Sequence, residues 1–532
     1  MLENIVQEQL IDNPHALLMV LKPEPGLESK VAEKTRQKLA EYKASLSQEE
    51  LEQLVKETRE LKEYQKKEDS PEALATIPML SLSDISREVQ WYEASEKSIN
   101  DIPVLHYEDF TNNIVYTSLF FDARALPKEL IPYGNLLAEV LGKMNTENYS
   151  YGELNNALNI HTGGFYTYVT TYLEDHSDQK LIPKFRITAK ATLDKTKKLF
   201  ELVDEILNYS KLNDKERLKE VLLRHQSQIE SQVKNYGIGY AITRLNSYFS
   251  NEGMFNELTG GLTYYDFITD ISENFDSKSD ELIEKLEKTA GLLLNKQNLV
   301  AGITCSDENY STFEQAFDNF ISRLPDTATE FSKWDFDFEP KNEGLTSSSM
   351  VQYVIKGYDY KKLGYEWDGK MQVLNQILSR DYLQNKIRVM GGAYGGWANI
   401  SPNGNAFFAS YRDPNLAETL ENYDAAEEFL TSFDADTTEM TRYIIGTISN
   451  IDGPTTPSMR GYMAMNNYFT NTTRAEMEAE RNAILNTTAE DIRGFAKMIS
   501  DVMAQNIICV YGNDQKIKEN DDLFKEIRAV IN

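Results

Sequence analysis

The chain has 532 residues, 41 % of them hydrophobic, and 55 basic against 84 acidic side chains, for a formal net charge of −29. This length exceeds what one hydrophobic core supports and predicts about two to four domains, and the hydrophobic content excludes wholesale disorder. The negative charge argues against nucleic acid as a partner, because a polyanion would be repelled. We favour a well-solvated acidic surface over the alternative, an acidic chamber that attracts basic peptides.

Targeting signals and cysteine chemistry are not indicated. No stretch approaches about 18 apolar residues, so no membrane span is expected. The first residues lack the charged and apolar regions of a signal peptide, which makes the cytoplasm the expected location. Cys305 and Cys509 are too few for a disulfide framework or a cysteine zinc site, and both lie in apolar runs where buried thiols are usual.

The N-terminal region predicts a fragment of a domain followed by an exposed helical hairpin. Residues 2–10 indicate a short helix, and residues 15–22 a strand closed by a turn at 23–26 with no partner nearby. An isolated strand here is typical of the last strand of a preceding domain. Two charged helices follow, over 29–44 and from Ser47, whose hydroxyl forms a capping box with Glu50. A spacer between domains is the favoured role of this hairpin.

Two later segments repeat one order of elements, strand, helix, Gly-Gly pair and strand, which indicates an internal duplication. In the first segment these elements are 113–122, 130–144, Gly163-Gly164 and 166–172, and in the second 350–356, 370–385, Gly391-Gly392 and 397–400 with 406–411. Amphipathic helices follow, at 214–234 in the first and at 416–432 and 438–450 in the second. The pattern predicts two related α+β domains in tandem, with helices on one face of a largely antiparallel sheet.

The expected boundaries follow from these elements, with the two domains separated within 335–344. They are 1–27 for the domain remnant, 28–70 for the hairpin, 71–105 for a connecting segment, 106–334 for the first α+β domain and 335–532 for the second.

The most informative motif is a pair of donors, Arg388 and Tyr394, in a run that contains Gly391, Gly392, Gly395 and Gly396. We predict that this run is a strand. Glycines remove the Cβ atoms that would hold another backbone away, and the Arg and Tyr side chains can donate to carbonyl or oxyanion groups. The sequence pattern thus indicates a surface that handles peptides, with a β-bulge and a core tyrosine as the alternative.

These features together resemble the insulinase-like (pitrilysin-type) zinc metallopeptidases, and among them the presequence-protease subfamily. The resemblance rests on the strand within 12–23, the charged hairpin, the duplicated halves and the Arg388-x5-Tyr394 motif. It implies four related domains in a complete enzyme, two in each half, which close around an unfolded peptide. This chain would be the hairpin with the C-terminal half, containing two insulinase-type (LuxS/metallohydrolase-like) α/β-sandwich domains in tandem.

The zinc motif of that family is missing from this sequence. No His-x-x-Glu-His can be read, and helix 130–144 offers Asn135 and Glu139 in its place, so we interpret it as a degenerate copy. A site built from His161, Glu174 and His176 matches no known ligand spacing and is disfavoured. No Gly-x-Ser-x-Gly motif of a serine hydrolase precedes a helix in this sequence. The glycine run also lacks the Lys-Ser/Thr pair that ends a phosphate-binding loop. Zinc is therefore expected in the complete enzyme and not in this chain.

The resemblance implies that Tyr394 donates to the oxyanion of the scissile bond and that Arg388 binds a substrate carbonyl, while Gly391, Gly392 and Gly395 admit the substrate backbone. An extended peptide would add to the edge of this strand. We therefore expect the substrate-binding half of a zinc endopeptidase for unstructured peptides, inactive without its N-terminal catalytic half. No nucleic acid or membrane partner is expected.

Two alternatives remain at this point. A non-catalytic interaction module of the same fold would pack or salt-bridge the side chains of Arg388 and Tyr394. An independent peptidase with an unforeseen metal site ranks last.

Overall fold

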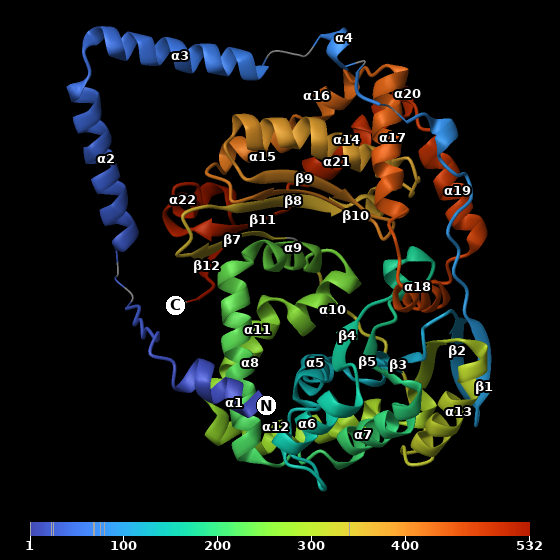
Figure 1. The fold of residues 1–532 in the computed structure, drawn as a ribbon. Helices are drawn as coiled ribbons and strands as arrows, with labels where there is room; N and C mark the ends of the chain where they lie inside the picture. Colours follow the sequence, from blue (N-terminus) through green and yellow to red (C-terminus); the bar gives the residue numbers. More distant parts are fainter. Residues whose placement is uncertain are drawn as a thin grey trace. The chain divides into compact units, whose positions relative to one another are not determined.

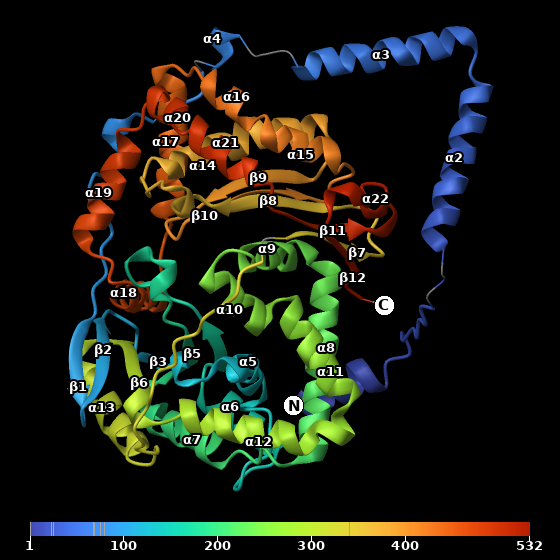
Figure 2. The same ribbon diagram turned by 180° about the vertical axis from the view of Figure 1, so that it is seen from behind.

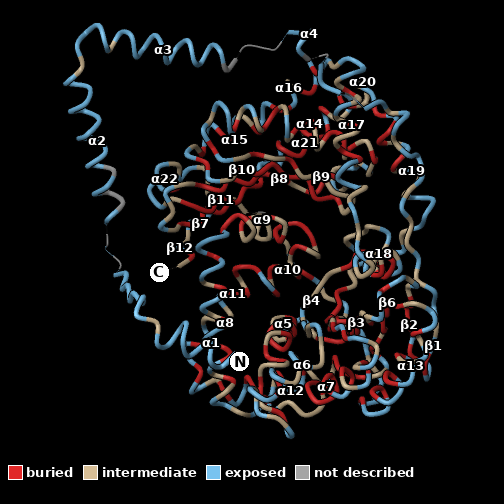
Figure 3. Tube along the Cα trace, viewed as in Figure 1, coloured by how far each residue is buried: buried red, intermediate tan, exposed pale blue. Residues whose placement is uncertain are grey.

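The computed structural model describes residues 2–22, 24, 26–66, 70–74, 76–78, 80–339 and 341–531 (Figure 1). The chain forms two units, Met1–Met79 and Leu80–Asn532, and the second contains both β-sheets. Figure 3 shows buried residues along the sheets and on the inner faces of the surrounding helices, whereas none of the described residues of the long N-terminal helices is buried.

The first unit contains the predicted helices. They are α1 (Leu2–Val6) with the π-wound turn η1 (Gln7–Ile11), α2 (Leu27–Ser45), α3 (Gln48–Lys66) and α4 (Pro71–Leu74). The capping box at the start of α3 is confirmed, since Ser47 N–H donates to Glu50 Oε2 at 2.8 Å and Glu50 N–H donates to Ser47 Oγ at 3.2 Å. These hydrogen bonds hold the pKa of the Glu50 carboxyl below its usual value.

The strand predicted at residues 15–22 is wrong in this structure. The chain there forms neither helix nor strand, and Leu17, Leu18 and Leu21 are 84 %, 90 % and 87 % exposed. A strand requires a hydrogen-bonded neighbour, and this apolar segment has none among the described residues of its unit. The turn predicted at 23–26 lies partly outside the described residues, which do not include Pro23 and Pro25.

Two six-stranded sheets form the body of the second unit. The strands of the first sheet are β1 (Ser95–Ile99), β2 (Ile102–Glu108), β3 (Ile114–Asp122), β4 (Phe165–Thr170), β5 (Lys184–Thr192) and β6 (Leu299–Cys305), and their order is β1-β2-β6-β3-β5-β4. The strands of the second are β7 (Asn342–Ser347), β8 (Tyr353–Asp359), β9 (Gly395–Ile400), β10 (Asn405–Tyr411), β11 (Ile508–Asn513) and β12 (Glu526–Ala529), in the order β12-β7-β11-β8-β10-β9.

The two sheets repeat one topology, which confirms the predicted tandem α+β fold. The order β2-β6-β3-β5-β4 corresponds strand by strand to β7-β11-β8-β10-β9. In each set the first pair is parallel and the other three pairs are antiparallel. The Gly-Gly pairs at 163–164 and 391–392 precede the equivalent strands β4 and β9. Only the outer strands differ, because β1 is antiparallel to its neighbour and β12 is parallel.

Helices surround both sheets, including all three regions predicted as amphipathic helices. Those of the first domain are α5 (Ile131–Val140), α6 (Tyr151–His161), α7 (Thr196–Tyr209), α8 (Lys215–Asn235), α9 (Gly237–Ser247), α10 (Asn251–Gly260), α11 (Leu262–Glu273), α12 (Phe275–Leu293) and α13 (Asp307–Ile321). Those of the second are α14 (Met371–Ile377), α15 (Ala417–Asp424), α16 (Ala426–Thr431), α17 (Thr437–Ile451), α18 (Pro457–Thr470), α19 (Arg474–Leu485), α20 (Ala489–Gly494), α21 (Ala496–Ala504) and α22 (Asp514–Lys518). No described helix is long and apolar enough to cross a membrane.

The two domains each contribute a helix to the second face of the other's sheet, as Figures 1 and 2 show for α9 and α18. Helix α9 of the first domain packs on β8 and β11, and α18 of the second packs on β2 and β6. The prediction of helices on one face only is therefore wrong. Strand β11 is buried at five consecutive positions, which is typical of a strand covered on both sides. Both cysteines are buried in equivalent strands, as predicted.

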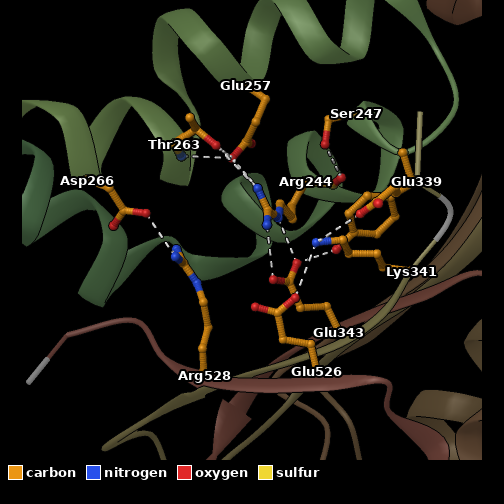
Figure 4. Close-up of polar contacts among 11 residues, drawn as sticks. Arg244, Ser247, Glu257, Thr263, Asp266, Glu339, Lys341, Glu343, Glu526 and Arg528 are labelled. Atoms are coloured by element: carbon orange, nitrogen blue, oxygen red, sulfur yellow. Dashed lines mark hydrogen bonds and ion pairs between the residues drawn. The ribbon is translucent and has the colours of Figure 1, made fainter. Parts of the chain in front are cut away.

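A buried ion pair joins the two domains where α9 packs on the second sheet (Figure 4). Arg244 of α9 donates to both carboxylate oxygens of Glu343 in β7, at 2.7 and 3.0 Å, and also to Glu257 at 3.1 Å. Glu343 is fully buried. Burial by itself raises the pKa of the Glu343 carboxyl, but the hydrogen bond and charge of Arg244 outweigh it and hold that pKa below its usual value.

The segment that we predicted as a linker belongs partly to the folded body. Strand β1 and the start of β2 lie within 71–105. Leu82 and Ile85 pack against the core of the second domain, and Arg481 donates to the carbonyl of Ser86 at 2.7 and 2.9 Å. The described residues from 326 to 339, between the two sheets, form no helix or strand. The domain limits proposed from sequence otherwise stay predictions.

Candidate functional site

Arg388 lies on a helix, which corrects the strand predicted for it. Helix α14 continues without a break into the π-wound segment η10 (Leu378–Met390), which packs beside β9. Leu383 and Ile387 are buried on its inner side while Arg388 is exposed in its last turn. The predicted helix ended at 385 because the following glycine run suggested a strand, whereas the helical segment continues for five more residues. Such π-wound segments occur frequently at functional sites.

Two of the glycines are needed to end this helix. Gly392 has a φ of +83°, in the left-handed region that glycine adopts most easily. Its N–H donates to Arg388 O, and Ala393 N–H donates to Ile387 O, both at 3.0 Å. A Cβ added at Gly391 would lie 2.7 Å from Ile387 O. Asn415 fixes the same turn by donating to Gly391 O at 2.7 Å. The turn directs the chain from the helix into β9.

The other two glycines have different surroundings. A Cβ at Gly396 would approach Ile387 Cβ to 3.0 Å, so close packing of the helix on β9 accounts for this residue. At Gly395 no heavy atom lies within 4 Å of an added Cβ. Gly395 is thus the glycine whose missing side chain leaves open space, as a site for a second backbone requires.

Tyr394 is the residue immediately before β9 and is 64 % exposed, which excludes the core tyrosine of the alternative interpretation. Its N–H donates to Tyr411 O at 2.9 Å, so the backbone is fixed while the ring projects outward. The guanidinium of Arg412 lies 5.5 Å from the ring centroid of Tyr394. Within the described part of the chain, the Tyr394 hydroxyl and the Arg388 side chain make no hydrogen bond or ion pair. Both donors are therefore available to a ligand.

Three neighbours of these donors were missed by the sequence reasoning. Val389 and Met390 are 69 % and 73 % exposed and form an apolar surface next to Arg388. Arg412 reaches Tyr394 because it has a left-handed φ of 51° directly after β10. Extending the helix to residue 390 would have indicated the first two as outward positions, whereas no sequence signal indicates the conformation of Arg412.

Strand β9 is an edge strand, but part of its edge is already occupied. The N–H of Ala398 donates to Ser379 Oγ at 3.0 Å, and Asn375 Nδ2 donates to Ile400 O at 2.8 Å. These side chains of α14 and η10 satisfy backbone groups that an added strand would need. The N-terminal end of this edge, adjacent to Tyr394, has no such side-chain partner among the described residues.

The described residues of this chain offer no group of side chains that fits a zinc ion. Helix α5 carries Asn135 and Glu139, as read from the sequence, and His225 of α8 lies beside Glu139. His225 Nε2 is hydrogen-bonded to the hydroxyl of Tyr264 at 3.0 Å, and its Nδ1 is 3.6 Å from Glu139 Oε2. Burial lowers the pKa of His225, and the charge of Glu139 opposes this only in part.

A search over all described residues finds no group of three or more His, Cys, Asp or Glu side chains able to hold a metal ion. His161, Glu174 and His176, the alternative site considered from sequence, accordingly do not gather into one. Nothing in the described chain thus replaces the missing zinc motif.

Comparison with known proteins decides the family. The model of a region associated with subfamily C of the M16 peptidases matches residues 21–271, and the model "PreP C-terminal domain" matches residues 342–511. The chain belongs to the M16 peptidase family. Within this family it is a presequence-protease-like C-terminal half, as the predicted resemblance indicated.

Similar proteins extend over nearly all of the chain. Protein HypA of Clostridium perfringens is 39 % identical over 529 residues, which are 99 % of this chain and 54 % of that protein. Presequence protease 1, chloroplastic/mitochondrial, of Arabidopsis thaliana is 28 % identical over 532 residues, covering 99 % of this chain and 49 % of that protein. This M16 chain thus spans about half the length of the curated relatives that it matches.

Solved structures share the fold at low identity. The peptidase M16 inactive domain from Pseudomonas fluorescens superposes with a TM-score of 0.56 at 15 % identity, covering 79 % of this chain and 97 % of that one. A protease from Helicobacter pylori gives a TM-score of 0.54 at 13 % identity, with 79 % and 99 % covered. These likenesses show the fold that this chain shares with those proteins.

Proposed function

We propose that this chain is the substrate-binding C-terminal half of a zinc-dependent endopeptidase that degrades unstructured peptides. The observation that supports it most is the pair of unengaged donors, Arg388 and Tyr394, exposed at the N-terminal end of the β9 edge. Because the zinc motif is absent here, a separate N-terminal half would supply the zinc and the activated water. The match to about half the length of presequence proteases supports this division of labour.

The proposed roles follow from the positions of the side chains. The phenolic hydroxyl of Tyr394 donates a hydrogen bond to the carbonyl oxygen of the scissile bond as negative charge develops on it. Arg388, one helical turn before the bend, donates to a neighbouring carbonyl of the substrate. Gly395 gives the substrate backbone room to approach, and the exposed Val389 and Met390 provide an apolar contact for its side chains.

An interaction module without catalytic purpose has less support. Such a module would be expected to pack or salt-bridge the side chains of Arg388 and Tyr394, whereas both are exposed and form no hydrogen bond or ion pair with the described residues. The proposed half-enzyme explains why both donors lack partners in the described chain.

The test is hydrolysis of a fluorogenic peptide of about 20 residues by a mixture of this chain and a zinc-binding N-terminal half. We expect activity only in the mixture, and Tyr394→Phe should lower kcat about 100-fold, as loss of one oxyanion donor does. Tyr236→Phe is the matched control, because Tyr236 is also 64 % exposed but lies between α8 and α9. Hydrolysis by the chain alone, or an unchanged kcat for Tyr394→Phe in an associated mixture, would contradict the proposal.

A further inference from the structure

A cavity of about 430 Å³ lies between the first sheet and α18, away from Arg388 and Tyr394. Strands β3, β4 and β5 form its floor, and α18, which both ribbon views place beside this sheet, forms its opposite wall (Figures 1 and 2). Its lining includes four tyrosines and one arginine: Tyr116, Tyr166, Tyr168, Tyr462 and Arg186. The volume is in the range of sites for small ligands or single side chains.

Arg186 is a buried cation of this cavity with no counter-charge among the described residues. It is only 7 % exposed, and the one side-chain hydrogen bond that it forms with the described residues runs from Nη2 to Ser118 Oγ at 3.0 Å. Its Nε is buried without any partner, and no carboxylate within the described chain forms an ion pair with it. A buried charge without partners is costly, so a group that supplies them would bind favourably here.

Aromatic rings hold the guanidinium in place. Its central carbon lies 4.4 Å from the ring centroid of Tyr462, 5.0 Å from that of Phe120 and 5.5 Å from that of Tyr168. Stacking of this kind fixes the plane of an arginine and leaves the N–H groups at its rim to recognise a planar anion. A carboxylate has the geometry that accepts two parallel N–H bonds from such a rim.

The neighbouring residues on β5 show that this lack of a partner is specific. Lys184, Arg186 and Lys190 lie on the same face of β5, because side chains alternate along a strand. Lys184 is also buried, but it has a carboxylate partner, Asp122, at 2.7 Å. Arg186, two positions on, has none, and exposed Lys190 extends the positive charge along the cavity. In a chain of net charge −29, this is a local basic site.

We propose that this cavity binds a carboxylate of a peptide substrate, with Arg186 as the anion-binding residue and the tyrosines as walls for the adjoining side chain. The inference rests on the proposed function, since it assigns a second contact for the peptide that Arg388 and Tyr394 would engage. The carboxylate can come from the C-terminus of the peptide or from an Asp or Glu side chain, because both present the same group.

Binding of short peptides to the 532-residue chain alone tests this assignment. Three fluorescein-labelled peptides of about 10 residues share one sequence: a C-terminal amide without acidic residues, the same peptide with a free C-terminus, and the amide with one internal Glu. We expect at least one carboxylate peptide to bind about 10-fold or more tightly than the neutral amide in fluorescence anisotropy, as a charge-assisted pair implies. The peptide that shows this preference identifies the source of the carboxylate.

Variants then locate the effect. Arg186→Gln should abolish the preference for the carboxylate peptide. Arg186→Lys keeps the charge but loses the planar donors, so it should reduce the preference several-fold. The Lys variant also provides a test if the Gln variant does not fold. Arg217→Gln is the matched control, because Arg217 also stacks on a tyrosine, Tyr151 at 3.8 Å, but is already paired with Glu220.

Equal affinity for all three peptides, no binding of any, or a preference that survives in folded Arg186 variants would overturn the assignment. Failure of this carboxylate-site assignment is distinguishable from failure of the proposed function. The proposed function is tested separately, by peptide hydrolysis and by the effect of Tyr394→Phe on kcat in the mixture of halves.

Discussion

The guanidinium of Arg244 forms two parallel hydrogen bonds with the carboxylate of Glu343, 2.7 and 3.0 Å long, across the boundary between the two domains. Around this pair, Arg528 binds Asp266 at 2.8 Å and Lys341 binds Glu526 at 3.2 Å (Figure 4). Arg244 reaches Glu343 because α9 of the first domain lies on the sheet of the second. A bidentate pair is directional, so it fixes how the two domains meet.

We predict that Arg244→Met lowers the free energy of unfolding by about 3–5 kcal/mol, because it leaves the buried carboxylates of Glu343 and Glu257 without their cation. The double change Arg244→Met with Glu343→Leu should recover much of that loss, since it removes one of the two unpaired charges. Urea denaturation followed by circular dichroism measures both. Arg474→Met, which breaks an exposed pair with Glu478, should cost less than about 1 kcal/mol; an equal cost would show that burial of the pair is unimportant.

The glycines around Tyr394 should separate into structural and functional residues. Gly392→Ala forces a side chain into a left-handed backbone, so we expect a loss of about 1 kcal/mol in stability. Gly395→Ala meets no neighbouring atom and should leave the melting temperature unchanged while raising the KM for peptides in the mixture of halves. Thermal unfolding and steady-state kinetics give the two readouts. A destabilised Gly395→Ala variant with unchanged KM would refute the role of Gly395 in substrate approach.

Arg388 should act on peptide binding through its planar donors. We expect Arg388→Gln to reduce kcat/KM in the mixture about 10- to 100-fold, as loss of a charge-assisted hydrogen bond does, and Arg388→Lys to restore only part of it. Because Arg388 is exposed and has no partner in the described chain, the folding free energy should stay within about 0.5 kcal/mol. Loss of stability in parallel with activity would instead indicate a structural role for this arginine.

The buried His225 should make the protein less stable in mild acid. Its pKa is lowered by burial, so below the unfolded value of about 6.5 the unfolded chain takes up a proton that the folded chain does not. Stability is therefore unaffected by this group above that pH and falls as the pH decreases below it, by up to about 1.4 kcal/mol per unit. Glu139 and Lys143 are the charged groups that act on it.

The measurement is the difference in unfolding free energy between the wild type and His225→Gln at about pH 7.5 and about pH 5.5, on either side of the unfolded pKa. Gln cannot titrate, so the wild type should lose more stability than the variant on acidification. Equal losses would show that His225 does not titrate differently in the folded and unfolded states.

The sequence predicted five of the twelve strands, β3, β4, β8, β9 and β10, and the order of strand and helix that both domains repeat, because these elements show clear apolar strand patterns and amphipathic helices. It failed where the neighbourhood in space decides the conformation. The glycine run after Arg388 suggested a strand. In the structure Ile387 packs closely against Gly396, and the helical segment continues to Met390. The apolar residues 15–22 suggested a strand, but a strand forms only where a neighbour supplies hydrogen bonds.

The candidate site was predicted as a pair of residues and not as a geometry. Arg388 and Tyr394 were identified from residue type and spacing, whereas their exposure, the open space at Gly395 and the approach of Arg412 are visible only in three dimensions. The occupied edge of β9 could not be predicted either, because Ser379 and Asn375 reach it from the helical segment that precedes the strand.

By itself, the sequence determined the α+β class, the tandem duplication and the lack of a zinc motif in this chain, since these depend on periodicity and local residue types. Tertiary structure alone decided that α9 and α18 each pack on the sheet of the other domain and that Arg244 meets Glu343. It also decided that Arg186 is buried with no carboxylate partner in the part of the chain that the structure describes. The physical reason is that contacts between residues distant along the chain depend on how complete elements pack, and no local pattern encodes which side chains then meet.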